Sequence, residues 1–304
     1  DPVNLAGTVV KRASLHNADF IEKMDIRVGD YVYVEKGGDI IPKITNVDTT
    51  KRNDDSEKFH FIEECPECGF SLKRIEGEAN HYCLNYNDCN PQVIGRIQHY
   101  ISRKALDIEG LGQETVALLV NAKLINNYSD LYDLKFDQIV SLERMAEKSA
   151  NNLIKGILDS KNIPFERVLY GLGIRYVGET VAKKLSKHFE NIDNILNSNF
   201  EELISVDEIG EKIANSIIEF ASNPDNTQTI EKLKKHGLKF EIDELDKNIS
   251  SALAGKSFVV SGVFSNYSRD EIKKLIESNG GKVSSSISSK TNYLVAGANM
   301  GPSK

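Results

Sequence analysis

All four cysteines of this chain lie within one stretch of 25 residues, and this clustering constrains the fold more than any other feature. The stretch reads CPECGFSLKRIEGEANHYCLNYNDC, and its thiols belong to Cys65, Cys68, Cys83 and Cys89. A C-x2-C pair lets two thiolates point at one ion, and zinc takes four ligands in a tetrahedron with sulfur at about 2.3 Å. Few large apolar residues lie between the pairs, so a metal would supply the stability that a core cannot. The spacing predicts a structural zinc site.

Two disulfides, or four free buried thiols, are the alternative interpretations. Disulfides persist mainly in secreted proteins, and the chain does not open with a charged and then apolar secretory signal. A catalytic zinc ion would keep one position open and usually take His or carboxylate ligands. We therefore expect the nearby His81 at the surface rather than on the metal.

The charge balance limits the partners that the chain can have. Its 304 residues carry a net charge of −7, which argues against a general polyanion binder. Nucleic acid stays open, because the local placement of charge matters more than the total. No run of about 18 apolar residues occurs, so we expect no membrane partner and an intracellular protein. The chain begins at Asp1 without an initiator methionine, so we expect a fragment.

Residues 1–58 carry a β pattern. Tyr31 and Tyr33 alternate with valines before a Gly-Gly turn, which is typical of a hairpin of half-buried strands. The preceding segment HNADFIEKMDI predicts a short helix with Asn17 as its N-cap. Strand, short helix and hairpin favour a small oligonucleotide-binding (OB) barrel, although other small β-barrels share the pattern.

From about residue 93 to 240 the apolar spacing becomes helical, and a repeat emerges within it. Four segments align at steps of 34, 32 and 32 residues, each centred on a small residue: Gly112, Ala146, Gly178 and Gly210. A helical solenoid fills its repeats with two long helices. Here the segments centre on tight glycine turns between short helices, which predicts helix–hairpin–helix repeats.

Such hairpins are suited to binding phosphate. A glycine lets the backbone approach a ligand closely, and the following helix offers unpaired N–H groups and a positive dipole end. The opposing interpretation is plain helix packing, since carboxylates follow several of the small residues directly and satisfy the dipole themselves. We predict DNA-backbone contacts at Gly110, Gly112, Gly178 and Gly210, with side-chain contacts from Lys148, Thr180 and Lys212 and a purely structural role for Ala146.

A different domain begins near Leu253, after a polar segment whose last part we interpret as a linker. The pattern there is a strand ending at Gly262, a helix capped by Ser268 and Glu271, and two short strands. This is a βαββ pattern, and we expect roughly half of such an α/β domain to be missing.

The order of these parts resembles the C-terminal portion of a bacterial NAD-dependent DNA ligase. The matching stretches are VVKRASLHN, GDIIPKI, CPECG, ISRKALDIEGLG, LERMAEKSA, LGIRYVGETVA and GKSFVVSG. The resemblance implies a multidomain α+β chain. Its parts are an OB-fold domain at 1–58 lacking its first segment, a four-cysteine zinc finger at 59–92, an all-α helix–hairpin–helix domain with linker at 93–250, and a truncated α/β BRCT domain at 251–304.

The resemblance also implies a function. The family's whole enzyme closes around nicked duplex DNA and seals it during replication and repair, using NAD and magnesium. Its adenylation domain carries a Lys-x-Asp-Gly motif that this sequence lacks. The fragment would therefore have no catalytic residue and be inactive alone, with the missing adenylation domain as its partner in cis. A monomer in the bacterial cytoplasm, associated with the nucleoid, is implied too.

Two further sites follow from the resemblance. Lys11 and Arg12 match a strand on the family's DNA-facing OB surface, although solvated surface cations are the commoner case. Some BRCT domains bind phosphate through a Ser-Gly pair and a later lysine, which Ser261, Gly262 and Lys304 match; the motif is weak. Two other functions stay open: a non-catalytic DNA-binding or phosphopeptide-binding repair scaffold, and a repair nuclease subunit that reuses hairpin repeats.

Overall fold

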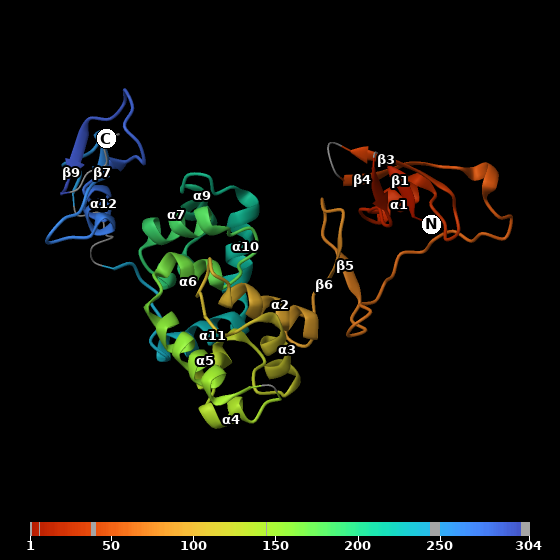
Figure 1. Cartoon of the computed structure of the whole chain (residues 1–304), viewed down its shortest axis with the longest axis horizontal. Coiled ribbons are helices and arrows are strands. Elements are labelled where there is room, and N and C mark those ends of the chain that lie inside the picture. Colours follow the sequence, from red (N-terminus) through yellow and green to blue (C-terminus); the bar gives the residue numbers. More distant parts are fainter. Residues whose placement is uncertain (1, 6, 38–40, 144, 244–249, 299–304) are drawn as a thin grey trace. The chain divides into compact units, whose positions relative to one another are not determined.

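The computed structural model in Figure 1 describes residues 2–5, 7–37, 41–143, 145–243 and 250–298. The chain divides into two compact units, Asp1–Gln92 and Val93–Lys304. Within the described residues, no helix is both long and apolar enough to cross a membrane.

The first unit opens with a small β domain. Its elements are β1 (Val3–Leu5), β2 (Thr8–Val10), α1 (Ala18–Met24), β3 (Val32–Gly37), β4 (Ile41–Val47) and the 3-10 turn η1 (Thr49–Lys51). The strands form two antiparallel hairpins, β1–β2 and β3–β4. An isolated parallel bridge pairs Ser14, after β2, with Lys43 in β4, and so joins the two hairpins.

The alternation in β3 separates a buried from an exposed face. Val32 and Val34 pack against the core of the domain, whereas Tyr31 and Tyr33 are 60% and 55% exposed. The hairpin is therefore half buried, as its sequence predicts. Asn17 caps α1 by accepting a hydrogen bond from a backbone N–H at 2.9 Å, which confirms the predicted start of the helix.

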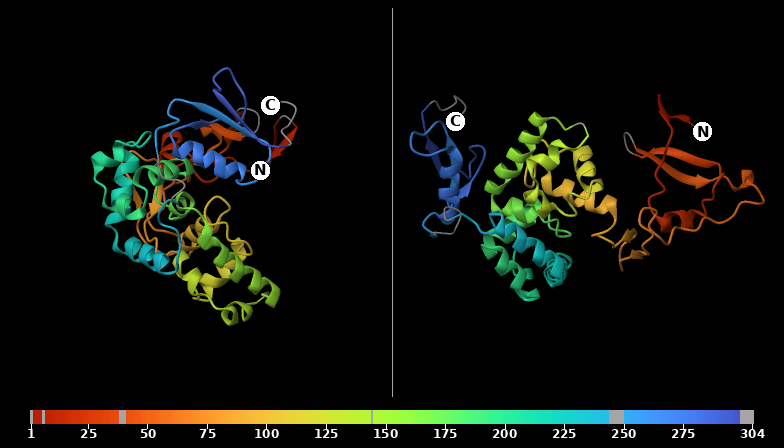
Figure 2. Two further views of the ribbon diagram at one scale, coloured as in Figure 1. Left: turned by 90° about the vertical axis from the view of Figure 1, so that its left-hand side faces the viewer. Right: turned by 90° about the horizontal axis from the view of Figure 1, so that it is seen from below.

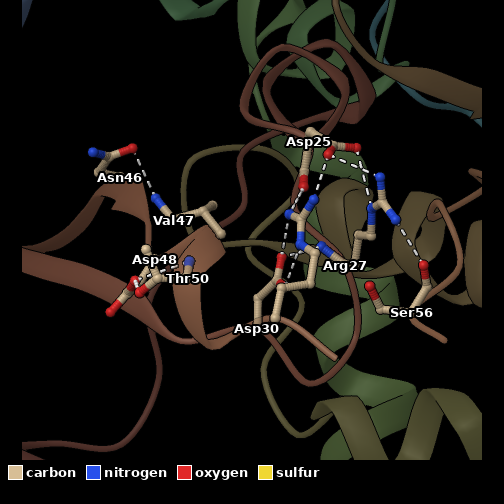
Figure 3. Close-up of polar contacts among 9 residues, drawn as sticks. Asp25, Arg27, Asp30, Asn46, Val47, Asp48, Thr50 and Ser56 are labelled. Carbon is tan, nitrogen blue, oxygen red and sulfur yellow. Dashed lines mark hydrogen bonds and ion pairs between the residues drawn. The ribbon is translucent and has the colours of Figure 1, made fainter. Parts of the chain in front are cut away.

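A cluster of charged side chains fastens the chain after β4 to the loop before β3 (Figure 3). The Asp30 side chain is 1% exposed, and its Oδ2 lies 2.8 Å from Nη2 of Arg52. Arg52 also reaches the Asp25 carboxylate at 2.5 Å, and Arg27 donates to the Ser56 carbonyl at 2.7 Å. Hydrogen bonding from Arg52 holds the pKa of Asp30 below its ordinary value of 3.8.

Replacing Arg52 by methionine is expected to destabilise this unit at neutral pH and to flatten its acid response. Because the folded pKa of Asp30 is lowered, its contribution is complete above 3.8 and is lost as pH falls through the folded value. The variant removes the guanidinium that pairs with this buried carboxylate, so we expect a thermal midpoint on the order of 5 °C lower at neutral pH. The gap to the wild type should close in strong acid.

Lys51→Met is the matched control, because the Lys51 side chain is 60% exposed and its amine pairs with Asp48 only one helical turn away. It should leave the thermal midpoint unchanged, since such pairs contribute little. An Arg52→Met protein that melts with the wild type at neutral pH would contradict this account of the cluster.

Two short antiparallel strands, β5 (Leu72–Arg74) and β6 (His81–Cys83), follow in the same unit. The Arg74 guanidinium of β5 pairs with the Asp19 carboxylate of α1, so this hairpin contacts the β domain.

Helices make up the second unit up to residue 243 (Figures 1 and 2). They are α2 (Asn90–Ile101), α3 (Gln113–Asn121), η2 (Tyr128–Asp133), α4 (Phe136–Val140), α5 (Glu147–Asp159), η3 (Ser160–Asn162), α6 (Phe165–Gly171), α7 (Glu179–Phe189), α8 (Ile192–Asn197), α9 (Phe200–Ile204), α10 (Glu211–Ser222) and α11 (Pro224–Lys235). One continuous apolar core runs through them.

The predicted repeat corresponds to four helix pairs: α2 with α3, α4 with α5, α6 with α7, and α9 with α10. The fourth residue after each small position is fully buried: Val116, Ala150, Ala182 and Ala214 all have 0% exposure. The repeat thus fixes a buried contact at the start of each second helix, while the small residues themselves stay at the surface.

The polar segment after α10 contains more structure than its sequence indicates. Pro224 occupies the first turn of α11, after an Asn223 cap. Ile230 and Leu233 of α11 are buried, as are Leu238 and Phe240 beyond it. The part that we interpret as a linker therefore begins later than the polar composition indicates.

The last domain is a small α/β layer. Its elements are β7 (Ser257–Ser261), α12 (Arg269–Ser278), β8 (Lys282–Val283) and β9 (Tyr293–Ala296). The strands are parallel, in the order β8-β7-β9, with β7 central. Ser268 and Glu271 form the predicted capping box on α12. The βαββ pattern of the sequence is thus confirmed.

Candidate zinc centre and nucleic-acid interface

The four cysteine sulfurs converge on one point in the first unit. The Sγ atoms of Cys65 and Cys89 lie 4.0 Å apart, and those of Cys68 and Cys83 lie 3.6 Å apart. All four sulfurs lie within 4.8 Å of one another. A tetrahedral zinc ion with sulfur at about 2.3 Å separates its ligands by about 3.8 Å, so this spacing fits zinc.

Local backbone geometry brings the thiols together. The Cys65 N–H donates to the Phe70 carbonyl at 2.8 Å, and the Gly69 N–H donates to the Cys65 carbonyl at 2.9 Å. Gly69 closes this turn at φ +70, a conformation that favours glycine. Cys83 ends β6, and Cys89 stands directly before α2, so two separate elements carry the second pair.

The thiols differ in how readily they ionise. The backbone N–H of Phe70 lowers the pKa of Cys68 to about 7, whereas burial raises the pKa of Cys89 to about 12. Burial also raises the pKa of Cys83 above 9.0. Several thiolates side by side need a cation, and zinc is a soft cation that suits them. The donor set therefore fits zinc, and four thiolates leave no open position for catalysis.

His81 does not lie where we expect it. Its ring is half buried rather than at the surface, and it lies against the Phe61 ring with centroids 4.6 Å apart. The sequence gives no sign of this contact, because Phe61 lies outside the cysteine stretch.

Each second helix of the four pairs in the other unit starts at an exposed small residue. These N-caps make no side-chain capping hydrogen bond; they are Gly112, Ala146, Gly178 and Gly210. A Cβ added at any of the three glycines would meet no atom within 4 Å. The first N–H groups of these helices thus lie at an open surface, as anion binding requires.

In the first, third and fourth hairpins, the tight bend lies two residues before the small position. The three N-cap glycines have φ between −80 and −93, an ordinary extended backbone. The left-handed residues are Gly110 at φ +83, Tyr176 at +64 and Glu208 at +66. Arg144, at this position in the second repeat, lies outside the described residues. The prediction of a tight glycine turn is therefore wrong for the N-caps, where glycine matters because it lacks a side chain.

The turns differ in charge, which the alignment of the repeats does not reveal. At the third, Glu179 is neutralised by Lys104, whose Nζ lies 2.6 Å from its carboxylate. At the fourth, Asp207 and Glu208 face Lys184 at 2.8 and 3.0 Å. Two carboxylates for one cation leave the fourth turn less suited to phosphate than the third.

The residues predicted to contact DNA through their side chains are all exposed. Lys148, Thr180 and Lys212 each occupy the second position of their helix, at the surface. Gly110 has a packing role as well, because a Cβ there would lie 3.4 Å from the Leu153 nitrogen. The exposed positions of these three side chains are compatible with contacts to a DNA backbone.

Lys11 and Arg12 are exposed, but they follow β2 instead of lying in it. Val3 pairs with Val10, so the next partner of Lys11 would be Pro2, which has no N–H to donate. The ladder therefore ends at Val10.

The Ser-Gly pair in the last domain has a structural explanation. Gly262 lies at φ +99, and a Cβ there would come within 2.6 Å of the Gly297 backbone. Its carbonyl accepts a hydrogen bond from Arg269 at 2.6 Å, and Ser261 is buried. Close packing of two backbones thus accounts for Gly262 without a phosphate. Lys304 lies outside the described residues.

Comparison with known families matches each part of the chain. Residues 1–56 match the NAD-dependent DNA ligase OB-fold domain, and 64–90 match the NAD-dependent DNA ligase C4 zinc finger domain. Residues 167–230 match the helix-hairpin-helix motif, and 248–304 match the BRCA1 C Terminus (BRCT) domain. The predicted fold class is thereby confirmed.

Comparison of the whole chain with individual proteins agrees with these domain matches. The chain is 64% identical to a DNA ligase of Flavobacterium psychrophilum, 62% to one of Flavobacterium johnsoniae and 56% to one of Bacteroides fragilis. Each match covers all of this chain and 46% of the relative, so the chain spans about half the length of these proteins.

These four folded parts, with a C4 zinc finger between an OB fold and helical hairpins, define part of a DNA ligase. The chain belongs to the bacterial NAD-dependent DNA ligase family.

Proposed function

We propose that this chain holds nicked duplex DNA for an NAD-dependent ligase that seals the nick in replication and repair. The observation that carries the proposal is the set of exposed, uncapped helix starts in the helix–hairpin–helix domain. Several weak phosphate contacts of this kind add up to useful affinity without any formal positive charge. This reconciles DNA binding with a net charge of −7.

Each domain has its own role in holding the DNA. The OB domain (1–58), with Lys11 and Arg12 at its surface, and the hairpins (93–250) contact the DNA backbone. The zinc finger (59–92) joins these two domains. It holds its zinc ion through Cys65, Cys68, Cys83 and Cys89. The BRCT domain comprises residues 251–304. NAD and magnesium act at the adenylation domain of the parent protein. The parent protein is a monomer in the bacterial cytoplasm, associated with the nucleoid. Backbone contacts carry no base code, so binding follows duplex shape.

Nicked and intact duplexes of the same sequence test this proposal directly. The chain should bind both, with log affinity falling linearly with log salt concentration, and should bind the nicked duplex more tightly. With NAD and magnesium it should yield no sealed product, because it has no Lys-x-Asp-Gly motif. Fluorescence anisotropy of labelled duplexes gives the affinities, and denaturing gels report sealing.

The outcomes separate the alternatives. Equal affinity for nicked and intact DNA favours a general DNA-binding scaffold over a ligase platform. An affinity for DNA that does not change with salt concentration would contradict binding through contacts with the DNA backbone. Sealing by the isolated chain would overturn the assignment of the chemistry to another domain.

A further inference from the structure

The segment 57–62, with the sequence EKFHFI, forms no backbone hydrogen bond with any described part of the chain. It contains no helix or turn, and it runs as an extended stretch between η1 and β5 (Figure 1). All of its residues are exposed. An extended chain whose N–H and C=O groups are not bonded is a template for pairing with another strand, so this segment is an open edge.

Both ends of the segment are fixed by the rest of the first unit. Before it, the Ser56 carbonyl accepts a hydrogen bond from Arg27 at 2.7 Å. After it, the Glu63 carbonyl accepts a hydrogen bond from the Leu72 N–H at 2.7 Å. A segment that is already held in place loses less conformational freedom when a partner binds to it.

The segment presents two aromatic rings on one face. Phe59 and Phe61 are two residues apart, as side chains on one face of an extended chain are, and their ring centroids lie 6.5 Å apart. The zinc finger supports them, because the Phe61 ring also lies against the His81 ring. Phe59 and Phe61 nevertheless remain 45% and 37% exposed, and Ile62 is 50% exposed. Large apolar side chains on an open edge indicate a surface that a partner covers.

The charge around the segment indicates the chemistry of that partner. Residues 54–64 carry one lysine and five exposed carboxylates, none within ion-pair distance of a described cation: Asp54, Asp55, Glu57, Glu63 and Glu64. This charge repels the phosphates of DNA. It also disfavours a second copy of the same segment, since like charges on facing strands are destabilising. A chain rich in lysine or arginine is the complementary partner.

We infer that the segment 57–62 is a docking site for a partner protein, which adds an extended, basic strand to it. The added strand pairs with the backbone of the segment, and its apolar side chains pack on Phe59 and Phe61. Its cations face the flanking carboxylates. The inference goes beyond the proposed function and does not depend on it, because this acidic surface takes no part in DNA binding.

Amide hydrogen exchange tests the pairing directly, with a short peptide of alternating lysine and valine as the probe. In the zinc-bound chain alone, the amides of residues 57–62 should exchange freely. At a saturating concentration of the peptide, their exchange should slow by about tenfold or more. Residues 265–267, which are exposed in the last domain, are the internal control and should not change. No protection of residues 57–62 by the peptide would overturn the inference.

Related peptides separate the charge from the backbone pairing. A peptide of alternating glutamate and valine should not bind, and binding of the lysine peptide should weaken as salt is added. Methylating one alternate set of amide nitrogens in the lysine peptide should abolish its binding, whereas methylating the other set should not, since a strand pairs along one edge. Binding of the glutamate peptide, or of both methylated peptides, would contradict strand addition to an acidic segment.

Two variants test the aromatic face. Phe59→Ser should bind the lysine peptide about tenfold more weakly. Phe70→Ser is the matched control and should bind like the wild type, because Phe70 is a similarly exposed aromatic residue (43%) on the finger outside the segment. Equal affinities of the two variants would overturn the assignment of this face to the site.

The same exchange measurement identifies a different occupant. Protection of residues 57–62 by duplex DNA, or by raising the concentration of the chain itself, would overturn the inference in favour of DNA or of a second copy. Loss of peptide binding with intact duplex binding would leave the proposed function standing, so the two can fail separately.

Discussion

Cys89→Ser is expected to reduce bound zinc from about one ion per chain to none and to unfold the finger around it. Cys89 is the most buried of the four thiols, at 2% exposure, and stands directly before α2. A hydroxyl is a poor zinc ligand, and the three remaining sulfurs would leave a buried, incomplete site. The hairpin β5–β6 is short, with no apolar core cluster of its own among the described residues, so its order depends on the metal.

Thiol titration makes this test sharp because the chain has four cysteines and all lie in the site. The wild type should show no reactive thiol until a chelator is added, and then four. Glu67→Gln, an exposed change between Cys65 and Cys68, is the matched control and should keep its zinc. Full zinc content in Cys89→Ser, or a metal-free wild type with an intact finger, would refute the site.

Gly178→Val is expected to weaken duplex binding about tenfold, the loss of one hydrogen bond to a charged group. The side chain would stand over the first N–H groups of α7 and keep phosphate away from them. The fold should tolerate it, because a Cβ there meets no atom within 4 Å and φ is an ordinary −80. Loss of affinity without loss of stability is the combination that identifies a contact surface.

Gly210→Val should have a smaller effect, because Asp207 and Glu208 already disfavour phosphate at the fourth turn. Gly95→Val is the control for added bulk: Gly95 is exposed on α2, has open space around it and lies outside the hairpin turns. DNA affinity and thermal midpoint should be measured for all three. Unchanged affinity in Gly178→Val would contradict a phosphate contact at the start of α7.

Local signals account for much of what the sequence predicts correctly. Asn17 and the pair Ser268 and Glu271 mark helix starts because a cap acts within three residues. The alternation of tyrosine and valine marks a half-buried strand for the same reason. The convergence of the four cysteines can also be predicted from the sequence, because zinc imposes one geometry on any four thiols that can reach it.

The misses have a common cause in contacts between distant residues or in backbone register. The end of β2 before Lys11 depends on its pairing register, which places Pro2 opposite. The close approach of Gly262 to Gly297 depends on two strand ends meeting. The left-handed residue of the three described bends is missed because three chemically different residues, Gly110, Tyr176 and Glu208, share one backbone conformation.

The sequence by itself determined the parts of this protein: the zinc ligands, the fourfold repeat, the capped helices and their order. Tertiary structure alone decided the charge and the rigidity of each turn. Lys104 neutralises Glu179 from 75 residues away, and Ser216 fixes the Arg175 carbonyl from 41 residues away. Caps and periodicities act over one or two turns of chain, whereas the charge and rigidity of a surface depend on whichever side chains folding brings within a few ångströms.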